Sequence, residues 1–306
     1  MSANQNILIS VVMASYNGER FIAAQIDSIL NQSYSNFELI ICDDASEDQT
    51  QKIVEEYSRQ DSRIQFHVNA MRLGLNKNFE KAVSLAKGNL IAITDQDDIW
   101  RLDKLEKLLA LFKTEQTVLV HGQSLRFSTT PPLDQKFFTK RNLLEGGNPA
   151  QLLYFNTVAG HNIVFRKKLL ERHPIFPEGI FYDWWLVMLA LNLGKVEANP
   201  EVLTFHRNHD NNVTLGKKDE KRQTKAKAKE RMLALEIFIN QLALPQQVNN
   251  IATPLLKKLK LLNEKRFSIS LFLFLVKHSN VLFFFKKNKF PFLSTLKICY
   301  RMSWAL

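Results

Sequence analysis

Three carboxylates within four positions are the most chemically distinctive feature of this sequence. Asp95, Asp97 and Asp98 come directly after the apolar stretch at residues 90–94. Carboxylates crowded at the end of a buried strand repel one another unless a cation lies among them. Such oxygen-rich sites suit Mg²⁺ or Mn²⁺, which can bridge to substrate phosphates. We therefore interpret Asp95-x-Asp97 as a metal–diphosphate site, and the alternative is a solvated loop with Asp98 near the start of the next helix.

The chain before and after this motif alternates short apolar runs with segments of helical period. We expect strands at residues 7–14, 37–42, 64–68 and 90–94, with helices at 21–30, after 46, at 79–86 and after 102. This alternation predicts an α/β fold whose doubly wound, mostly parallel sheet is flanked by helices. Open sheets of this kind bind ligands at the carboxyl ends of their strands. The three carboxylates fall at that edge.

The second part of the expected catalytic region is less regular. Residues 128–149 contain Thr-Thr-Pro-Pro and Gly-Gly and are predicted to form a loop over a cleft. A strand is expected at residues 160–165, a helix at 181–193 and a short strand at 202–206.

Length and composition restrict the class of protein. The chain has 306 residues, of which 45% are hydrophobic, enough for a catalytic domain plus an appendage. Cys42 and Cys299 are far apart and form no disulfide framework, which fits a reducing, cytoplasmic compartment. The first apolar run has no basic segment before it, so it is predicted to be a strand and not a signal peptide.

The net charge of +11 is distributed unevenly. Residues 217–306 hold 19 Lys and Arg but only 5 Asp and Glu, whereas residues 1–216 hold 22 and 25. We therefore expect a catalytic domain at 1–216 and a basic, Phe-rich, mainly helical extension at 217–306.

The extension contains an apolar stretch at residues 267–285 that is interrupted by Lys277 and His278. A Lys at mid-bilayer costs about 2.5–3.5 kcal/mol on insertion scales, against about 0.3–0.6 kcal/mol gained per Leu or Phe. Binding in the interface of an anionic membrane is therefore favoured over spanning it. A helical cap packed on the catalytic domain is the other alternative.

Seven short motifs between residues 7 and 212 carry a family resemblance. They are VVMASYNG (11–18), SILNQSY (28–34), FELIICDDAS (37–46), TDQDDIW (94–100), GHN (160–162), YDWW (182–185) and HRNH (206–209). Together they resemble family 2 glycosyltransferases of the GT-A fold, and among these the rhamnosyltransferase-like enzymes of bacterial surface polysaccharide synthesis.

The resemblance implies donor-binding roles for residues in the first half of the chain. The backbone at Ala14 and the ring of Tyr16 would contact the nucleobase, and Asp44 would accept a hydrogen bond from N3–H of uracil or thymine. The donor would thus be a UDP- or dTDP-linked sugar. Asp97 would ligate Mg²⁺ or Mn²⁺, and Asp95 would contact the donor ribose or the metal through water.

The resemblance also assigns roles to residues late in the catalytic region. Asp183 would be the general base that takes the acceptor hydroxyl proton in an inverting transfer, although capping of a helix alone would also explain this residue. His209 and Arg207 would complete the metal–diphosphate site. His206 stands where the family usually has Tyr, so no role is assigned to it.

The expected activity is transfer of rhamnose or another hexose to a lipid-linked or growing surface polysaccharide, at the inner face of the plasma membrane. One rival is a catalytically weak membrane-surface binding protein on a transferase fold. Nucleic acid is not an expected partner, because the aromatic residues of the extension cluster as Phe runs and are not interspersed singly among basic residues. A haloacid-dehalogenase-type phosphatase is disfavoured because its Asp-x-Asp normally follows the first strand.

Overall fold

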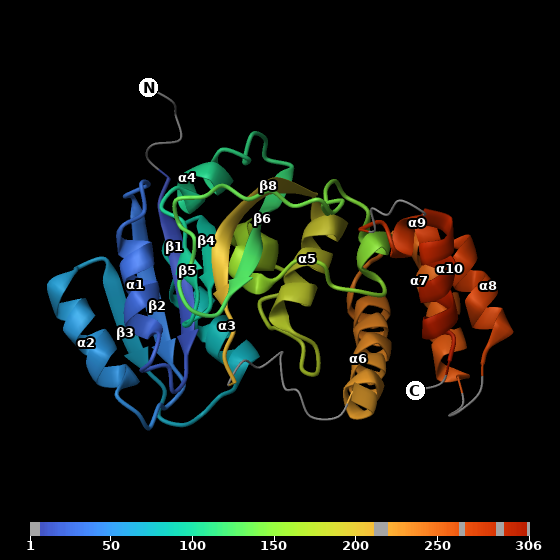
Figure 1. Cartoon of the computed structure of the whole chain (residues 1–306), viewed down its shortest axis with the longest axis horizontal. Helices are drawn as coiled ribbons and strands as arrows, with labels where there is room; N and C mark the ends of the chain where they lie inside the picture. The colour runs from blue at the N-terminus through green and yellow to red at the C-terminus, as the bar shows by residue number, and fades with distance from the viewer. Residues whose placement is uncertain (1–6, 211–219, 263–266, 286–290, 305–306) are drawn as a thin grey trace.

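The computed structural model describes residues 7–210, 220–262, 267–285 and 291–304. Within these ranges one eight-stranded sheet has the order β3-β2-β1-β4-β7-β6-β8-β5. Helices cover both of its faces, and the C-terminal helices lie at the end of the molecule opposite α2 and β3 (Figure 1). The expected α/β class, with a helical C-terminal region, is confirmed.

The strands of the first half follow the predicted order. The sheet consists of β1 (Ile9–Ser15), β2 (Phe37–Asp43), β3 (Ile64–Val68), β4 (Leu90–Thr94), β5 (Ile99–Trp100), β6 (Thr117–Phe127), β7 (Ile163–Arg166) and β8 (Lys195–Arg207). β1 pairs in parallel with β2 and β4, β2 with β3, and β6 with β8. β7 runs antiparallel to both β4 and β6, and β5 antiparallel to β8. β6 was not predicted, and the expected short strand at 202–206 is the second half of the longer β8.

The α-helices are α1 (Ile22–Leu30), α2 (Thr50–Gln60), α3 (Leu75–Leu85), α4 (Lys104–Leu109), α5 (Tyr182–Leu193), α6 (Glu220–Gln241), α7 (Gln246–Lys260), α8 (Ile269–Lys277), α9 (Ser279–Leu282) and α10 (Pro291–Met302). The 3₁₀ turns of the described residues are η2 (Pro149–Leu152), η3 (Gly160–Asn162) and η4 (Lys167–Leu170). The strand predicted at 160–165 therefore starts three residues late, because its first residues form η3. Between β6 and η2 the described chain is irregular, as predicted for residues 128–149.

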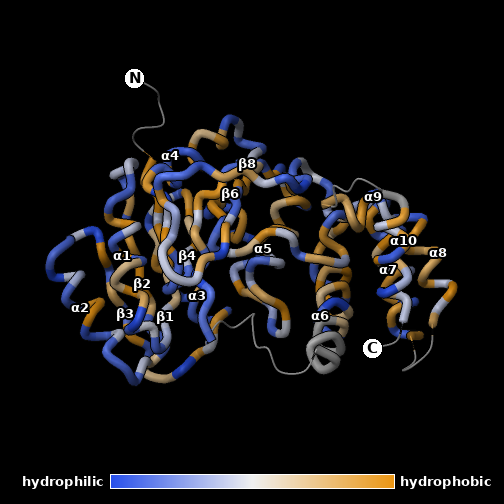
Figure 2. The backbone as a smooth tube through the Cα atoms, viewed as in Figure 1, coloured by the Kyte–Doolittle hydropathy of each residue, from blue (hydrophilic) through white to orange (hydrophobic). Residues whose placement is uncertain are grey.

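The sheet separates two hydrophobic cores. Successive side chains of a strand point to opposite faces. Accordingly, Val11 of β1 packs in the cluster that contains Ile26 of α1, whereas Val12 packs in the cluster that contains Phe79 of α3. Figure 2 shows the hydrophobic residues of the central strands between helices whose outer turns are largely hydrophilic. Both faces of the parallel strands are thus buried, and only their carboxyl ends are left to form a site.

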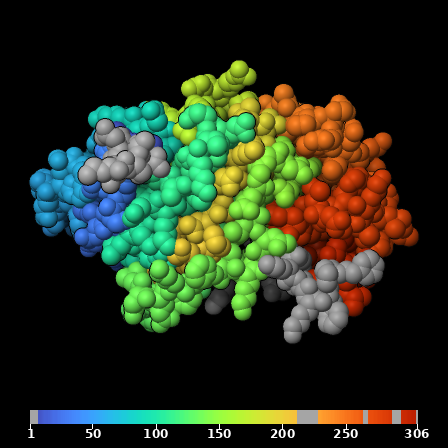
Figure 3. Space-filling view, turned by 90° about the horizontal axis from the view of Figure 1, so that it is seen from above, coloured from blue at the N-terminus to red at the C-terminus, as the bar shows by residue number. Residues whose placement is uncertain are grey.

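The C-terminal helices pack on the catalytic region through α5 and α6. The ring centroid of Phe238 lies 5.9 Å from Trp184 and 6.4 Å from Trp185. Buried side chains of α7, α8 and α10 belong to the same cluster as α3 and α5. The packing expected of a helical cap is therefore present, and Figure 3 shows these helices at the end of the molecule away from the N-terminal strands.

Two expectations about the extension have different outcomes. The boundary between residues 216 and 217 lies outside the described residues, so the division into two domains stays a prediction. Among the described residues, each helix is too short or too polar to cross a bilayer.

Candidate active site

The carboxyl end of β2 carries two adjacent carboxylates with different partners. Asp43 is fully buried and accepts hydrogen bonds from the Ser15 hydroxyl (2.9 Å) and the Ser46 amide (2.8 Å). Asp44 accepts from the backbone amides of Leu73 (2.6 Å) and Gly74 (2.8 Å). Asp43 therefore holds the turn after β2, and Asp44 fixes the start of α3 against β2.

Gln96, inside the acidic motif, hydrogen-bonds to the backbone of Tyr16 just after β1. Its side-chain amide donates to the carbonyl oxygen of Tyr16 (3.0 Å), and its amide oxygen accepts from the Tyr16 backbone N–H (2.9 Å). The guanidinium carbon of Arg72 lies 3.8 Å from the centroid of the Tyr16 ring. Ala14, two residues earlier, pairs with Cys42 in the β1–β2 ladder. The residues expected at the nucleobase thus lie beside those expected at the metal.

Asp97 meets residues from the far end of the catalytic region. Its Oδ2 lies 2.7 Å from His209 Nε2, and its carbonyl oxygen accepts from Arg207 Nε at 3.0 Å. The Phe21 ring contacts both of these side chains: its centroid lies 4.8 Å from the centroid of the His209 ring and 4.8 Å from the guanidinium carbon of Arg207. The expected association of Asp97, Arg207 and His209 is present in the structure.

Asp98 is fully buried between two histidines. Its Oδ1 accepts from His206 Nδ1 (2.9 Å), and its Oδ2 lies 3.3 Å from His161 Nδ1. The same His161 nitrogen lies 3.0 Å from Asp95 Oδ2, and the two imidazole rings stack at 4.9 Å. Burial raises the pKa of Asp98, but the charges and hydrogen bonds of His161 and His206 outweigh it, so the pKa lies below its usual range.

A buried lysine contacts the two elements that carry His161 and His206. Lys104 donates to the carbonyl oxygen of His161 (2.6 Å) and to the Thr204 hydroxyl (2.9 Å), and its Nζ lies 3.6 Å from the centroid of the Trp100 ring. Burial holds the pKa of Lys104 well below its usual range, against the charges of Asp98 and Asp95. Lys104 therefore links η3 to β8, the two elements that carry the histidines.

The donor set at the end of β4 fits a divalent cation. Asp95, Asp98, His161 and His206 offer ligand atoms that all lie within 4.8 Å of one another. Among the described residues, the buried Asp98 Oδ2 and His161 Nε2 have no hydrogen-bond partner. Beside this group, burial and then repulsion from Asp95 and Asp98 raise the pKa of Asp97 to about 6. A cation at Asp97 would relieve that repulsion.

Asp183, in the first turn of α5, is tied to the same turn as His161. Its Oδ2 accepts from the Gly160 amide (3.2 Å) and its Oδ1 from the Trp184 amide (2.7 Å). A side chain at Gly160 would clash, because an added Cβ would lie 2.1 Å from the Tyr182 hydroxyl. Burial raises the pKa of Asp183 to about 7, and the charge of Asp95 adds to this. At neutral pH this carboxylate can therefore take up a proton.

The site contains residues to which the sequence analysis assigned no role. Gln96 and Arg72 contact Tyr16, and His161 contacts Asp95. His206 contacts Asp98, and Lys104 donates to the His161 carbonyl. His161 lies in a polar Gly-His-Asn segment that interrupts an apolar pattern, which was an available signal. Lys104 gave no such signal, since a Lys next to Leu105 in a short helix usually extends to solvent.

Comparison with known proteins identifies the family. The model of "Glycosyl transferase family 2" matches residues 10–173. WfaP of Escherichia coli, named a UDP-Glc:alpha-D-GlcNAc-diphosphoundecaprenol beta-1,3-glucosyltransferase, is 30% identical over 69% of this chain and 81% of its own length. Over the first relatives matched, the chain spans between 45% and 78% of the relative's length.

Two solved structures share the fold at low sequence identity. S. aureus TarS in complex with UDP-GlcNAc is 17% identical, with a TM-score of 0.64 over 83% of this chain and 72% of that one. The mannosyltransferase PcManGT from Pyrobaculum calidifontis, in complex with GDP-Man and Mn²⁺, is 18% identical, with a TM-score of 0.59 over 81% and 68%. The family model covers more than half of the sequence, and the chain therefore belongs to glycosyl transferase family 2, as a glycosyltransferase with the GT-A fold.

Proposed function

We propose that this glycosyltransferase moves a hexose with inversion from a nucleotide-diphosphate donor, in a reaction that depends on Mg²⁺ or Mn²⁺. The observation that carries the proposal is the grouping of Asp97 and His209 with Asp95 at the end of β4, beside Asp183. It brings a candidate cation site and a candidate base to one edge of the sheet.

The nucleobase end of the donor would lie at the ends of β1 and β2. The Tyr16 ring offers a stacking surface, and the backbone at Ala14 is at the same edge. Both oxygens of Asp44 already accept hydrogen bonds from the α3 side, which orients the carboxylate. Oδ1 also accepts from Asn69 Nδ2 (3.0 Å), whereas Oδ2 accepts from the Gly74 amide alone among the described residues. Oδ2 therefore retains a lone pair that can accept from N3–H of uracil or thymine. A UDP- or dTDP-linked donor follows from this role.

The cation would be held by Asp97 and His209, with Asp95 contacting it or the donor ribose. Asp98 is the less suitable ligand, because it is fully buried and already contacts both His161 and His206. Asp95 and Asp97 keep 34% and 15% of their side chains exposed and can reach a substrate. These residues would hold a divalent ion, whose positive charge would offset the negative charge that develops on the departing nucleotide diphosphate. Arg207, anchored on the Asp97 carbonyl, would add a positive charge near the phosphates.

Asp183 would act as the general base. As the acceptor hydroxyl attacks the anomeric carbon, the bond from that carbon to the diphosphate breaks, and Asp183 takes the hydroxyl proton. Its pKa of about 7 is close to the pH at which a base is most effective. The Gly160 amide orients the Oδ2 atom, so the position of the base is fixed relative to η3, whose His161 contacts the acidic cluster.

The acceptor would be lipid-linked or part of a growing surface polysaccharide, since related glucosyltransferases are named for diphosphoundecaprenol-linked acceptors. The enzyme would work in the cytoplasm, as a peripheral protein on the inner face of the plasma membrane. The basic C-terminal helices would supply attachment to that anionic surface. Rhamnose is one candidate sugar, and glucose, named in those relatives, is another.

A donor screen tests the proposal. Nucleotide release would be measured with UDP-, dTDP- and GDP-linked hexoses, with Mn²⁺ or with chelator, in the presence of a diphospholipid-linked sugar acceptor. We expect cation-dependent release with a uracil or thymine donor and a product of inverted anomeric configuration. Release that persists with chelator would remove the metal assignment, and a preference for GDP would remove the role of Asp44.

A further inference from the structure

The outer side of the C-terminal helices exposes large apolar residues. Leu261, Ile269 and Leu273 are 69%, 66% and 59% exposed. On α8, Ile269 and Leu273 are four residues apart and therefore lie on one side of the helix, whereas Leu271 and Leu275 are buried. A helix on a soluble protein usually turns only one apolar side inward. α8 has a second one facing outward.

Aromatic residues connect the start of α8 to the end of α10. The Phe267 ring centroid lies 5.2 Å from Tyr300 and 5.5 Å from Trp304. The Ser268 amide donates to the Ser303 carbonyl (2.8 Å), which fastens the start of α8 to the end of α10. Tyr300 and Trp304 are both exposed. Tyr and Trp with an apolar body and a polar edge are favoured at the membrane–water interface.

The charges around these residues have a single sign. Residues 237–262, 267–285 and 291–304, all in the described part, contain no Asp or Glu. Five cations there form no ion pair with another described residue: Lys257, Lys258, Lys277, Lys297 and Arg301. Lys260 differs, since it pairs with Glu236 of α6. We call these five cations, with Leu261, Ile269, Leu273, Tyr300 and Trp304, the C-terminal face. Its uncompensated positive charge beside exposed apolar groups matches an anionic surface with an apolar interior.

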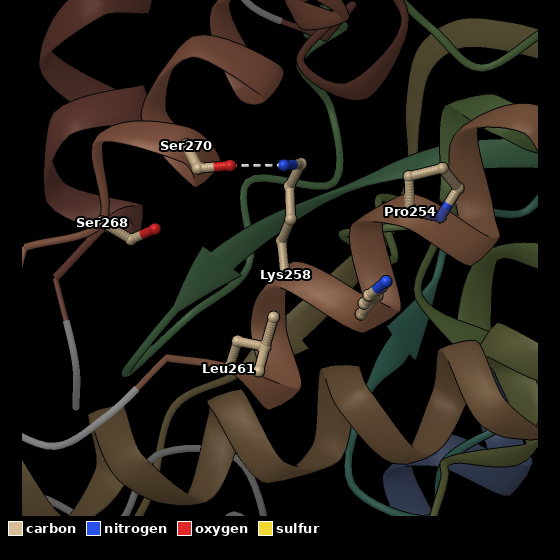
Figure 4. Close-up of a pocket in the computed structure, with 6 residues that line it drawn as sticks. Pro254, Lys258, Leu261, Ser268 and Ser270 are labelled. Carbon is tan, nitrogen blue, oxygen red and sulfur yellow. Dashed lines mark hydrogen bonds between the residues drawn. The ribbon is translucent and has the colours of Figure 1, made fainter.

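A cavity of about 250 Å³ opens between α7 and the start of α8. Its lining consists of Pro254, Lys257, Lys258, Leu261, Ser268 and Ser270. Figure 4 shows Lys258 reaching across the cavity, where its Nζ donates to the Ser270 hydroxyl. Two ammonium groups and two hydroxyls provide donors for a phosphate, and Pro254 and Leu261 provide contact for the adjoining glycerol carbons.

We propose that the C-terminal face docks on an anionic phospholipid bilayer, with Ile269, Leu273 and Trp304 in the interface and one lipid phosphate in the cavity beside Lys258. The proposal deepens the proposed function, on which it rests for the need to reach a membrane-linked acceptor. It identifies which side of the protein meets the lipid and which group of the lipid is recognised.

Vesicle flotation tests the docking. The full chain would be mixed with vesicles of phosphatidylcholine alone or of phosphatidylcholine with phosphatidylglycerol. We expect binding to the mixed vesicles only. The double variant Ile269→Ser/Leu273→Ser should bind at least about tenfold more weakly, because two aliphatic groups leave the interface. The matched control Leu102→Ser/Leu133→Ser, at exposed leucines elsewhere, should bind as the unmodified chain does; equal binding by both double variants would overturn the docking.

Trp304 reports the orientation. Trp100 and Trp185 are buried and Trp184 nearly so, whereas Trp304 is exposed. Mixed vesicles should shift the tryptophan emission to shorter wavelength, and Trp304→Phe should abolish that shift without abolishing flotation. A shift that survives in Trp304→Phe would place the contact elsewhere on the protein.

The cavity is tested by charge-matched variants. Lys257→Gln/Lys258→Gln and Lys277→Gln/Lys297→Gln each remove two charges, worth about fivefold in binding per residue from the surface potential alone. Loss of a seated phosphate should make the first variant clearly weaker than the second. Equal losses would remove the cavity from the proposal.

Two further measurements separate the possible failures. Binding of nucleotide with Mn²⁺ should be unchanged in Ile269→Ser/Leu273→Ser, because this variant leaves the active site intact. Conversely, an Asp97 variant that loses donor binding but floats normally with vesicles has a defect in the active site alone. If sedimentation shows that the Ile269→Ser/Leu273→Ser variant dissociates a dimer while vesicle binding is unchanged, a second copy of the chain occupies the face and the lipid proposal is wrong.

Discussion

The Nε2 atom of His209 lies 2.7 Å from Oδ2 of Asp97, although 112 residues separate the two in the sequence. β8 lies parallel to β6 and ends at Arg207, two residues before His209. A carboxylate and an imidazole in contact, each still partly exposed at the carboxyl ends of the strands, are suitable ligands for a divalent cation.

Asp97→Asn should weaken Mn²⁺-dependent binding of the nucleotide diphosphate by at least about tenfold, because a neutral amide is a poor ligand for a hard cation. Isothermal titration with and without Mn²⁺ measures this. Asp134→Asn, at an exposed loop position, serves as the control and should bind normally. Unchanged binding in Asp97→Asn would show that the cation is held elsewhere, with the group of Asp95, Asp98, His161 and His206 as the next site to test.

Asp183→Asn should retain donor binding and lose transfer by a factor of at least about 10², the usual contribution of one well-placed base. Single-turnover transfer and nucleotide titration together separate the two effects. Glu178→Gln changes an exposed carboxylate on the segment before α5 and should leave both unchanged. Near-normal transfer in Asp183→Asn would leave this residue with only its role at the start of α5.

The pH dependence of transfer follows from the raised pKa of Asp183. The carboxylate must be deprotonated to accept a proton, and its pKa is about 7. kcat/KM should therefore rise about tenfold per pH unit below pH 7 and level off above it. A pH profile of the unmodified enzyme and of Asp183→Asn checks this. The rising limb should be missing from the variant, and a limb that remains would belong to another group.

Lys104→Met should lower the free energy of unfolding by about 1–3 kcal/mol, because the buried His161 carbonyl and Thr204 hydroxyl lose a donor. Urea denaturation at constant pH measures the change. Lys113→Met, at an exposed position after α4, is the matched control. A variant as stable as the unmodified chain would mean that Lys104 is replaceable by packing alone.

Much of the N-terminal half could be predicted from periodicity. β1 to β4 and α1 to α3 follow the alternation of apolar runs and helical segments within a few residues. β6 was missed because Thr117–Phe127 alternates only in its second half and is buried throughout its first. The strand expected from residue 160 starts at Ile163 because Gly160–Asn162 turn to meet Asp183 and Asp95.

The residues of the site also fall into those that the sequence indicated and those that it did not. Asp95 and Asp97 were singled out as carboxylates at the end of an apolar run, whereas Asp183 and the association of Asp97 with His209 were expected from the family resemblance; their roles stay predictions. The burial of Asp98 between His161 and His206 was not foreseen, because it depends on β7 and β8 being brought into the sheet after β4. Strand order is a property of tertiary packing and leaves no local pattern.

The sequence by itself determined the α/β class, the family and the carboxylates at the end of the fourth strand, since all of these follow from local period and short motifs. Tertiary structure alone decided that Asp98 lies between His161 and His206, that Lys104 is buried, and which side of the C-terminal helices is left uncovered. The physical reason is that the contacts of Lys104, His161 and His206 join residues 57 to 108 positions apart, so only the packing of the sheet and helices brings them together.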